Sequence, residues 1–123
     1  MKSKTNHPET VLQRLRTICL SLPGAEERTT WGHPTFTVQG RPFAVFEEYK
    51  GEWCVCFRVE LPHQELFLKD PRFLMTPYIG KQGWVSLRVY AAPLNWTEIG
   101  HLLTESHRLL SSLPKSKRAR TRR

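Results

Sequence analysis

The sequence predicts a single α+β domain in which an antiparallel β-sheet meander carries the N- and C-terminal helices on one face. Two observations predict this class. Apolar residues recur at helical spacing near both ends of the chain, whereas between residues 26 and 59 they recur with a period of two. Glycine-containing turns also divide this middle region into short segments, as expected for consecutive antiparallel strands.

The first helix is expected to begin at Pro8, because proline suits the first turn of a helix. Pro23 and Gly24 should end it, since proline breaks the backbone hydrogen bonding and glycine turns easily. Between them, one apolar stripe on about four helical turns is formed by Val11, Leu12, Leu15, Ile18, Cys19 and Leu22.

The middle region predicts a meander of strands at about 26–31, 34–39, 42–48 and 53–60. Turn signals lie at residues 38–41 ("VQGR") and 49–52 ("YKGE"). In the last strand the apolar residues Trp53, Val55 and Phe57 alternate with cysteines and Arg58. The sheet should therefore have one apolar face and one mixed face.

The second half predicts a short helix after Leu61 that stops at Pro71, and then an ordered loop over residues 75–84. Residues 84–90 alternate almost perfectly and predict a further strand. A final helix should begin at the N-cap Asn95 and close at Pro114. Three of its residues fall off the apolar stripe and are expected to face water: His101, His107 and Arg108.

The charge of the chain divides it into a domain over residues 5–114 and a basic tail over 115–123. The formal net charge is +8, but the tail "KSKRARTRR" holds six basic residues and no acid, and Lys2 and Lys4 lie at the other end. The remaining eleven basic residues are balanced by eleven acids. The tail should be disordered; its use is either contact with a polyanion or solubility.

Several classes of protein are not indicated. No apolar run is long enough to cross a bilayer and no apolar stretch follows the N-terminus, so a cytoplasmic protein without membrane contact is expected. Cys54 and Cys56 are expected to be reduced strand residues, because neighbours on one strand rarely meet disulfide geometry. Apart from one loose pair at i, i+4, His101 and Glu105, the histidines share no ligand spacing with cysteines or acids, and one pair does not make a metal site. No metal or other cofactor is expected.

Four segments resemble the MmcQ/YjbR family: "LPGAEERTTWGHPTF" (22–36), "GRPFAVF" (40–46), "PYIGKQGWVSLRV" (77–89) and "NWTEIGHLLTESHRLL" (95–110). The resemblance extends over residues 9–113. It implies a curved antiparallel sheet with helices on one side, similar to frataxins of the CyaY type and to a double-wing DNA-binding domain. It also implies DNA binding, the role usually ascribed to the family.

Nucleic acid is accordingly the expected partner of a monomeric, non-enzymatic protein. Aromatic rings interleaved with guanidinium groups on the mixed sheet face could stack bases and hold phosphates, with low sequence specificity. The expected contacts on the domain are Arg41, Lys50, Arg58, Lys81, Trp84, Arg88 and Tyr90. In the tail they are Lys115, Lys117, Arg118, Arg120, Arg122 and Arg123. Alternatively, Trp84, Tyr90 and the arginine stems simply cover the sheet.

The run "WGHPTF" (31–36) raises an alternative function. Gly32 and Pro34 predict a bend between two strands, in which the ring of His33 packs or bonds to a loop carbonyl. If this bend meets the 75–84 loop, a pocket for a small ligand or a protein segment would form around His33, Tyr78, Lys81 and Trp84. An enzyme using His33 as a base is a third alternative; no catalytic residue is assigned.

Overall fold

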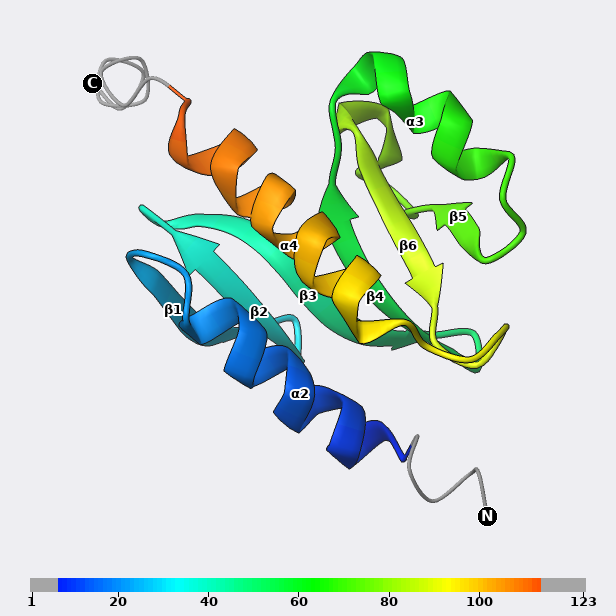
Figure 1. The fold of residues 1–123 in the computed structure, drawn as a ribbon, viewed down its shortest axis with the longest axis horizontal. Coiled ribbons are helices and arrows are strands. Elements are labelled where there is room, and N and C mark those ends of the chain that lie inside the picture. Colours follow the sequence, from blue (N-terminus) through cyan, green and yellow to red (C-terminus); the bar gives the residue numbers. More distant parts are fainter. Residues whose placement is uncertain (1–6, 114–123) are drawn as a thin grey trace.

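A computed structural model describes residues 7–113, which form one six-stranded antiparallel sheet and three α-helices (Figure 1). The strand order is β1-β2-β3-β4-β6-β5. The α+β class is thus confirmed, with a larger sheet than expected. In chain order the elements are α2 (Pro8–Leu20), β1 (Ala25–Thr30), β2 (His33–Val38), β3 (Arg41–Tyr49), β4 (Glu52–Arg58), α3 (Leu61–Leu68), β5 (Phe73–Met75), the short 3-10 helix η1 (Gly80–Gln82), β6 (Trp84–Arg88) and α4 (Trp96–Ser111).

The first four strands are joined by three two-residue hairpin turns, each ending in glycine. Both residues of every turn have positive φ, which is the type I′ geometry that matches the twist of the strands. The predicted turns at 38–41 and 49–52 are confirmed, and the bend predicted around Gly32 is the first of these hairpins. The turn residues are Trp31 and Gly32, Gln39 and Gly40, and Lys50 and Gly51.

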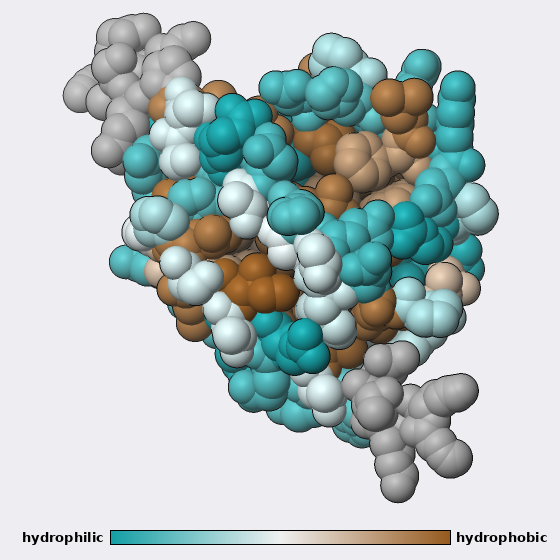
Figure 2. Space-filling model, viewed as in Figure 1, coloured by the Kyte–Doolittle hydropathy of each residue, from teal (hydrophilic) through white to brown (hydrophobic). Residues whose placement is uncertain are grey.

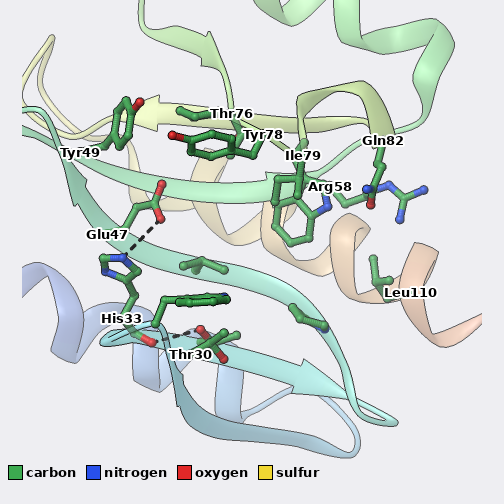
Figure 3. Close-up of a pocket in the computed structure, with 16 residues that line it drawn as sticks. Thr30, His33, Glu47, Tyr49, Arg58, Thr76, Tyr78, Ile79, Gln82 and Leu110 are labelled. Carbon is green, nitrogen blue, oxygen red and sulfur yellow. Dashed lines mark hydrogen bonds and ion pairs between the residues drawn. The ribbon is translucent and has the colours of Figure 1, made fainter.

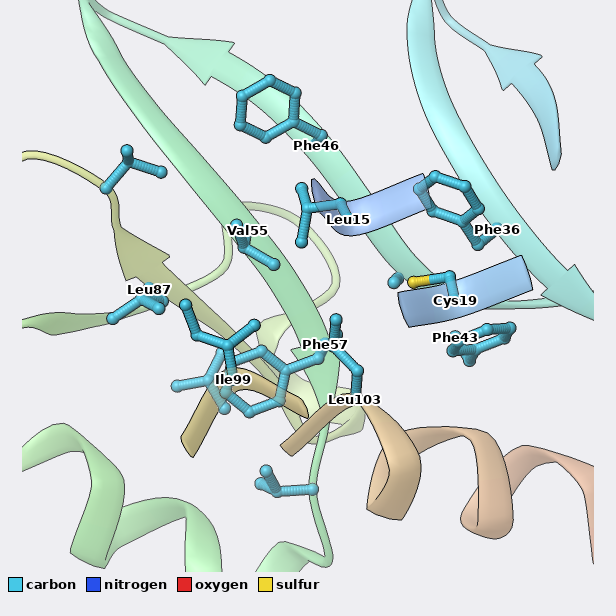
Figure 4. Packing of buried hydrophobic residues seen from close by; sticks show 14 of the residues in the cluster. Leu15, Cys19, Phe36, Phe43, Phe46, Val55, Phe57, Leu87, Ile99 and Leu103 are labelled. Carbon is cyan, nitrogen blue, oxygen red and sulfur yellow. The ribbon is translucent and has the colours of Figure 1, made fainter. Parts of the chain in front are cut away.

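Helices α2 and α4 lie side by side on one face of the sheet, where the main core forms (Figures 1 and 4). The buried residues of α2 are four apart, so they project from one side of the helix: Val11, Leu15 and Cys19. Those of α4 include Ile99, Leu103 and Leu110. They pack on a row of aromatic side chains from the sheet: Phe36, Phe43, Phe46 and Phe57.

The helix-covered face is mostly hydrophilic at its surface (Figure 2). Four arginines of the described residues are held by carboxylates. Arg16 forms a bidentate pair with Glu27, and Arg72 bonds both Asp70 and Glu98. Because these pairs join helices to strands or loops, they stabilise the edges of the core. The paired arginines do not form a basic surface. The other two paired arginines are Arg88 and Arg108.

Three details differ from the sequence predictions. Residues 73–75 form the short edge strand β5, paired with β6, where no strand was expected between the helix that stops at Pro71 and the loop. Strand β6 ends at Arg88, because the chain turns at the next residues. His107 was expected in water and is buried instead: its Nε2 lies 2.8 Å from the Pro23 carbonyl oxygen, and its ring packs edge-on against Phe43. His107 therefore ties α4 to the loop after α2.

The β3–β4 ladder opens at one end, where α4 inserts a hydroxyl group. The last paired residues are Ala44 and Phe57, and the alternation of the ladder would next pair Phe43 with Arg58. Instead, the fully buried Ser106 hydroxyl donates to the Phe43 carbonyl at 2.6 Å and accepts from the Arg58 N–H at 2.9 Å. A helix side chain thus replaces a backbone hydrogen bond.

Arg41 occupies the region next to this opening, which corrects the expectation that it is an exposed phosphate contact. Its residue is 6% exposed, and its Nη1 donates to the Leu110 carbonyl at 2.6 Å and to Gln39 Oε1 at 3.4 Å. The last carbonyls of a helix have no intrahelical donors, and a guanidinium group satisfies them well. Arg41 therefore serves as a cap for α4.

We expect Ser106→Ala to lower the free energy of unfolding by about 2 kcal/mol, because it leaves a buried N–H and a buried carbonyl without their partner. Urea denaturation monitored by circular dichroism measures the loss. Ser112→Ala is the matched control, since Ser112 is an exposed serine at the end of the same helix, and it should change stability by less than about 0.5 kcal/mol. Equal effects of the two substitutions would contradict the bridging role.

Candidate functional site

The sheet face opposite α2 and α4 carries a pocket of about 670 Å³ (Figure 3). This volume is in the range of small-molecule sites. The β1–β2 hairpin forms one side of the pocket and the loop between β5 and β6 forms the other, so the structure brings together the two segments named in the pocket alternative. Its lining residues are Thr30, Trp31, His33, Thr35, Pro42, Val45, Glu47, Tyr49, Arg58, Thr76, Pro77, Tyr78, Ile79, Gln82, Trp84 and Leu110.

Alternation along the strands places the lining side chains. On β4, Cys54, Cys56 and Arg58 point away from the main core, and their antiparallel partners do the same. These partners are Glu47 and Val45 on β3 and Trp84 on β6. Trp84 is 5% exposed and forms a second small apolar cluster with the two cysteines, packed against by Val45 and Ile79. The pocket therefore has an apolar floor on a rigid sheet.

Beside this cluster, a chain of three hydrogen-bonding side chains joins β4 and β6 to the loop after β5. The Thr76 hydroxyl lies 2.8 Å from the Ser86 hydroxyl, which lies 3.3 Å from Cys56 Sγ. Burial raises the pKa of the Cys56 thiol, and it raises the pKa of Cys54 to about 11. Both thiols are therefore protonated near neutral pH and are weak nucleophiles.

Two aromatic side chains at the rim are almost entirely exposed. Trp31 in the β1–β2 turn and Tyr78 in the β5–β6 loop each have 92% of their surface accessible. Both have positive φ, 55° for Trp31 and 68° for Tyr78, a conformation that bulky residues rarely adopt. Tyr78 also forms a side-chain hydrogen bond with Tyr49, which raises the pKa of Tyr78. The chain thus keeps large rings in unfavourable backbone positions where they contact solvent.

Charged groups lie toward opposite ends of the pocket. The Glu47 carboxylate lies between the rings of His33 and Tyr78, and Oε1 is 3.9 Å from His33 Nε2 (Figure 3). Arg58 lies toward the other end, near Gln82 and Leu110. Leu110 belongs to α4 on the covered face, and it lines the pocket beside the point where the β3–β4 ladder opens.

The seven expected nucleic-acid contacts of the domain do not form one surface. Arg58 and Trp84 line the pocket, whereas Arg41 is buried. Arg88 is bound to Glu52 by two hydrogen bonds, at 3.2 and 3.1 Å. Three others do not line the pocket and lie in turns or in η1: Lys50, Lys81 and Tyr90. The six expected contacts in the tail lie outside the described residues.

Of the four residues in the pocket alternative, the structure places His33, Tyr78 and Trp84 in one pocket and leaves Lys81 outside it. The sequence reasoning missed Trp31, Glu47 and Tyr49. Trp31 carried a usable signal, because a tryptophan before glycine in a two-residue hairpin must take positive φ. Within residues 7–113 there is no group of three or more metal-ligating side chains, and no helix there is long and apolar enough to cross a membrane.

Comparisons with known proteins identify the type of domain. The YjbR family model matches residues 20–109. A solved structure of Deinococcus radiodurans protein DR2400, described as a DUF419 domain, is similar with a TM-score of 0.73 and 18% identity over 89% of this chain and 86% of that one. A Pseudomonas syringae protein, structural genomics target PsR293, has a TM-score of 0.68 and 14% identity over 80% and 97%. The search of curated proteins gave no match.

We expect Trp31→Asn to raise the free energy of unfolding by about 1 kcal/mol, because asparagine tolerates positive φ better than tryptophan and Trp31 buries little surface. Thermal unfolding measures the change. Gln39→Asn is the matched control, since Gln39 has the same φ of 55° in the next hairpin and lies outside the pocket, and it should stabilise to a similar extent. Destabilisation by Trp31→Asn alone would mean that the indole ring supports the fold.

Proposed function

The chain belongs to the MmcQ/YjbR family, and we propose that it is a binding protein that holds a flat aromatic ligand in the open-face pocket. One observation carries the proposal: two almost fully exposed rings, Trp31 and Tyr78, stand at the rim of an apolar pocket. A soluble domain gains nothing in stability from such positions, whereas a ligand ring placed against them would bury apolar surface and stack.

Binding rather than catalysis is supported by the groups around His33. A histidine base needs a nucleophile or an acidic proton within reach. The Thr35 hydroxyl already donates to the His33 carbonyl at 3.1 Å, and the Cys56 thiol has a raised pKa and bonds Ser86 and Glu47. The Thr35 hydroxyl is therefore engaged, and the Cys56 thiol is both engaged and a weak nucleophile.

Indole is a suitable flat probe, and the four tryptophans of the chain supply an internal control. Trp31 and Trp84 line the pocket, whereas Trp53 stacks on Phe46 and Trp96 lies under Arg14 on the covered face. We expect indole to shift the side-chain N–H signals of Trp31 and Trp84 in a nitrogen-15 NMR titration. The signals of Trp53 and Trp96 should stay in place.

Substitution should locate the same site. Trp31→Ala and Tyr78→Ala should each weaken indole binding by about tenfold through loss of a stacking ring. Leu66→Ala should leave it unchanged, since Leu66 is exposed on α3 and lies outside the pocket. If indole shifts no pocket signal, or shifts all four tryptophans alike, the proposed function is wrong.

Nucleic-acid binding is the second candidate, and a specific sequence feature favours it. Residues 115–123 carry six basic side chains without an acid, a composition that attracts phosphates without reading sequence. The described domain adds little to this attraction, because most of its arginines are paired or buried. We therefore place this activity in the tail rather than on the sheet face.

Deletion of residues 115–123 should weaken binding of duplex DNA and flatten its dependence on salt, because fewer counterions are then released. Fluorescence anisotropy at several salt concentrations measures both effects. Indole binding by the truncated chain should not change, which separates the two candidate functions. Equal DNA binding and equal salt slopes for the truncated and full chains would contradict a role for the tail.

A further inference from the structure

Glu47 has acceptor capacity that the protein itself does not use. Its side chain is 19% exposed, and its neighbours are weak: Cys56 Sγ lies 3.6 Å from Oε2, and His33 Nε2 is beyond hydrogen-bond distance from Oε1. A thiol is a poor donor. Glu47 is also the only carboxylate among the lining residues. A half-buried carboxylate in such surroundings is stabilised by a ligand that donates N–H groups.

Arg58 is the complementary group. Arg16, Arg72 and Arg88 each hold a carboxylate, whereas the guanidinium of Arg58 has no ion pair with any described residue. It is half-buried and is the only arginine or lysine that lines the pocket. A guanidinium in this position can bind a phosphate through two parallel hydrogen bonds.

The register gives the separation of the two charges. Glu47 is paired with Cys54, and Arg58 lies four residues farther along the same strand, so the two positions are roughly 13 Å apart along the sheet. In the register Val45 lies on the floor between them, Trp84 lies beside Arg58 on β6, and Tyr78 lies close to Glu47 (Figure 3). The pocket thus fits a ligand with N–H donors on a flat ring at one end and an anion at the other.

Building on the proposed function, we infer that the ligand is a guanine nucleotide. Guanine presents two adjacent N–H donors, N1–H and the 2-amino group, which match the two oxygens of a carboxylate, whereas adenine, cytosine and uracil do not offer this pair. The ring would stack at the aromatic rim, with its donor edge at Glu47 and its phosphate at Arg58. The guanine belongs either to a free nucleotide or to an unpaired position in a nucleic-acid strand.

The test compares GMP, IMP and guanosine by isothermal titration calorimetry with the full chain. IMP lacks only the 2-amino group, so it should bind at least tenfold more weakly than GMP. Guanosine lacks the phosphate and should also bind more weakly. An oligothymidylate with one central guanosine, compared with plain oligothymidylate, separates the strand source from the free nucleotide.

Two variants test which residue binds each end of the ligand. Glu47→Gln has one acceptor oxygen in place of two, so the preference for GMP over IMP should fall to less than about threefold. Arg58→Gln should remove the preference for GMP over guanosine and keep that over IMP. Glu48→Gln and Arg28→Gln are the matched controls, since both residues are exposed on the same sheet, on β3 and β1, and lie outside the pocket, and they should retain both preferences.

The outcomes separate this inference from the proposed function. Equal affinity for GMP and IMP, or a preference that Glu47→Gln leaves intact, overturns the guanine assignment. If indole binds at Trp31 and Trp84 but neither GMP nor the guanosine-containing strand binds, the pocket proposal stands and the guanine assignment is wrong. If neither indole nor any nucleotide binds, both are wrong.

Discussion

The hydroxyl group of Ser106 makes two hydrogen bonds on which both faces of the sheet depend. By bonding the Phe43 carbonyl and the Arg58 N–H, it allows β3 and β4 to separate without leaving buried backbone groups unsatisfied. The separation fixes the backbone of Arg58 at one end of the pocket and lies beside Leu110, which lines that pocket from α4. The core on the covered face and the pocket on the open face therefore depend on the same hydrogen bonds.

The hairpin turns contain residues that are not the most stable choice for their backbone conformation. All three use type I′ turns with glycine second, but the first residues are Trp31, Gln39 and Lys50 rather than asparagine or aspartate. A long polar side chain in such a turn is easily solvated. A tryptophan exposes a large apolar ring as well, and this one stands at the pocket rim. Strain of this kind is typical of functional sites.

Sequence periodicity predicted most of the fold because the strands alternate cleanly and Asn95 caps α4, where it accepts bonds from Thr97 and Glu98. The edge strand β5 was missed because three residues after a proline turn carry no period. His107 and Arg41 were misplaced because their partners, Pro23 and Leu110, are far away in the chain. Periodicity predicts which face of an element a residue occupies. It does not predict whether a polar side chain is buried there, because burial depends on a hydrogen-bond acceptor that can lie far away in the chain.

The same limit applies to the site: the sequence gives the number of charged residues but not which of them form ion pairs. Five basic residues of the domain were predicted as phosphate contacts, yet the fold buries Arg41 and pairs Arg88 with Glu52. What distinguishes Arg58 and Glu47 is that the strand register places both on the open face, too far apart to neutralise each other. Two opposite charges held apart over an apolar floor favour a ligand that carries a polar group at each end. This requirement defines a narrower class of ligands than the net charge of the chain does.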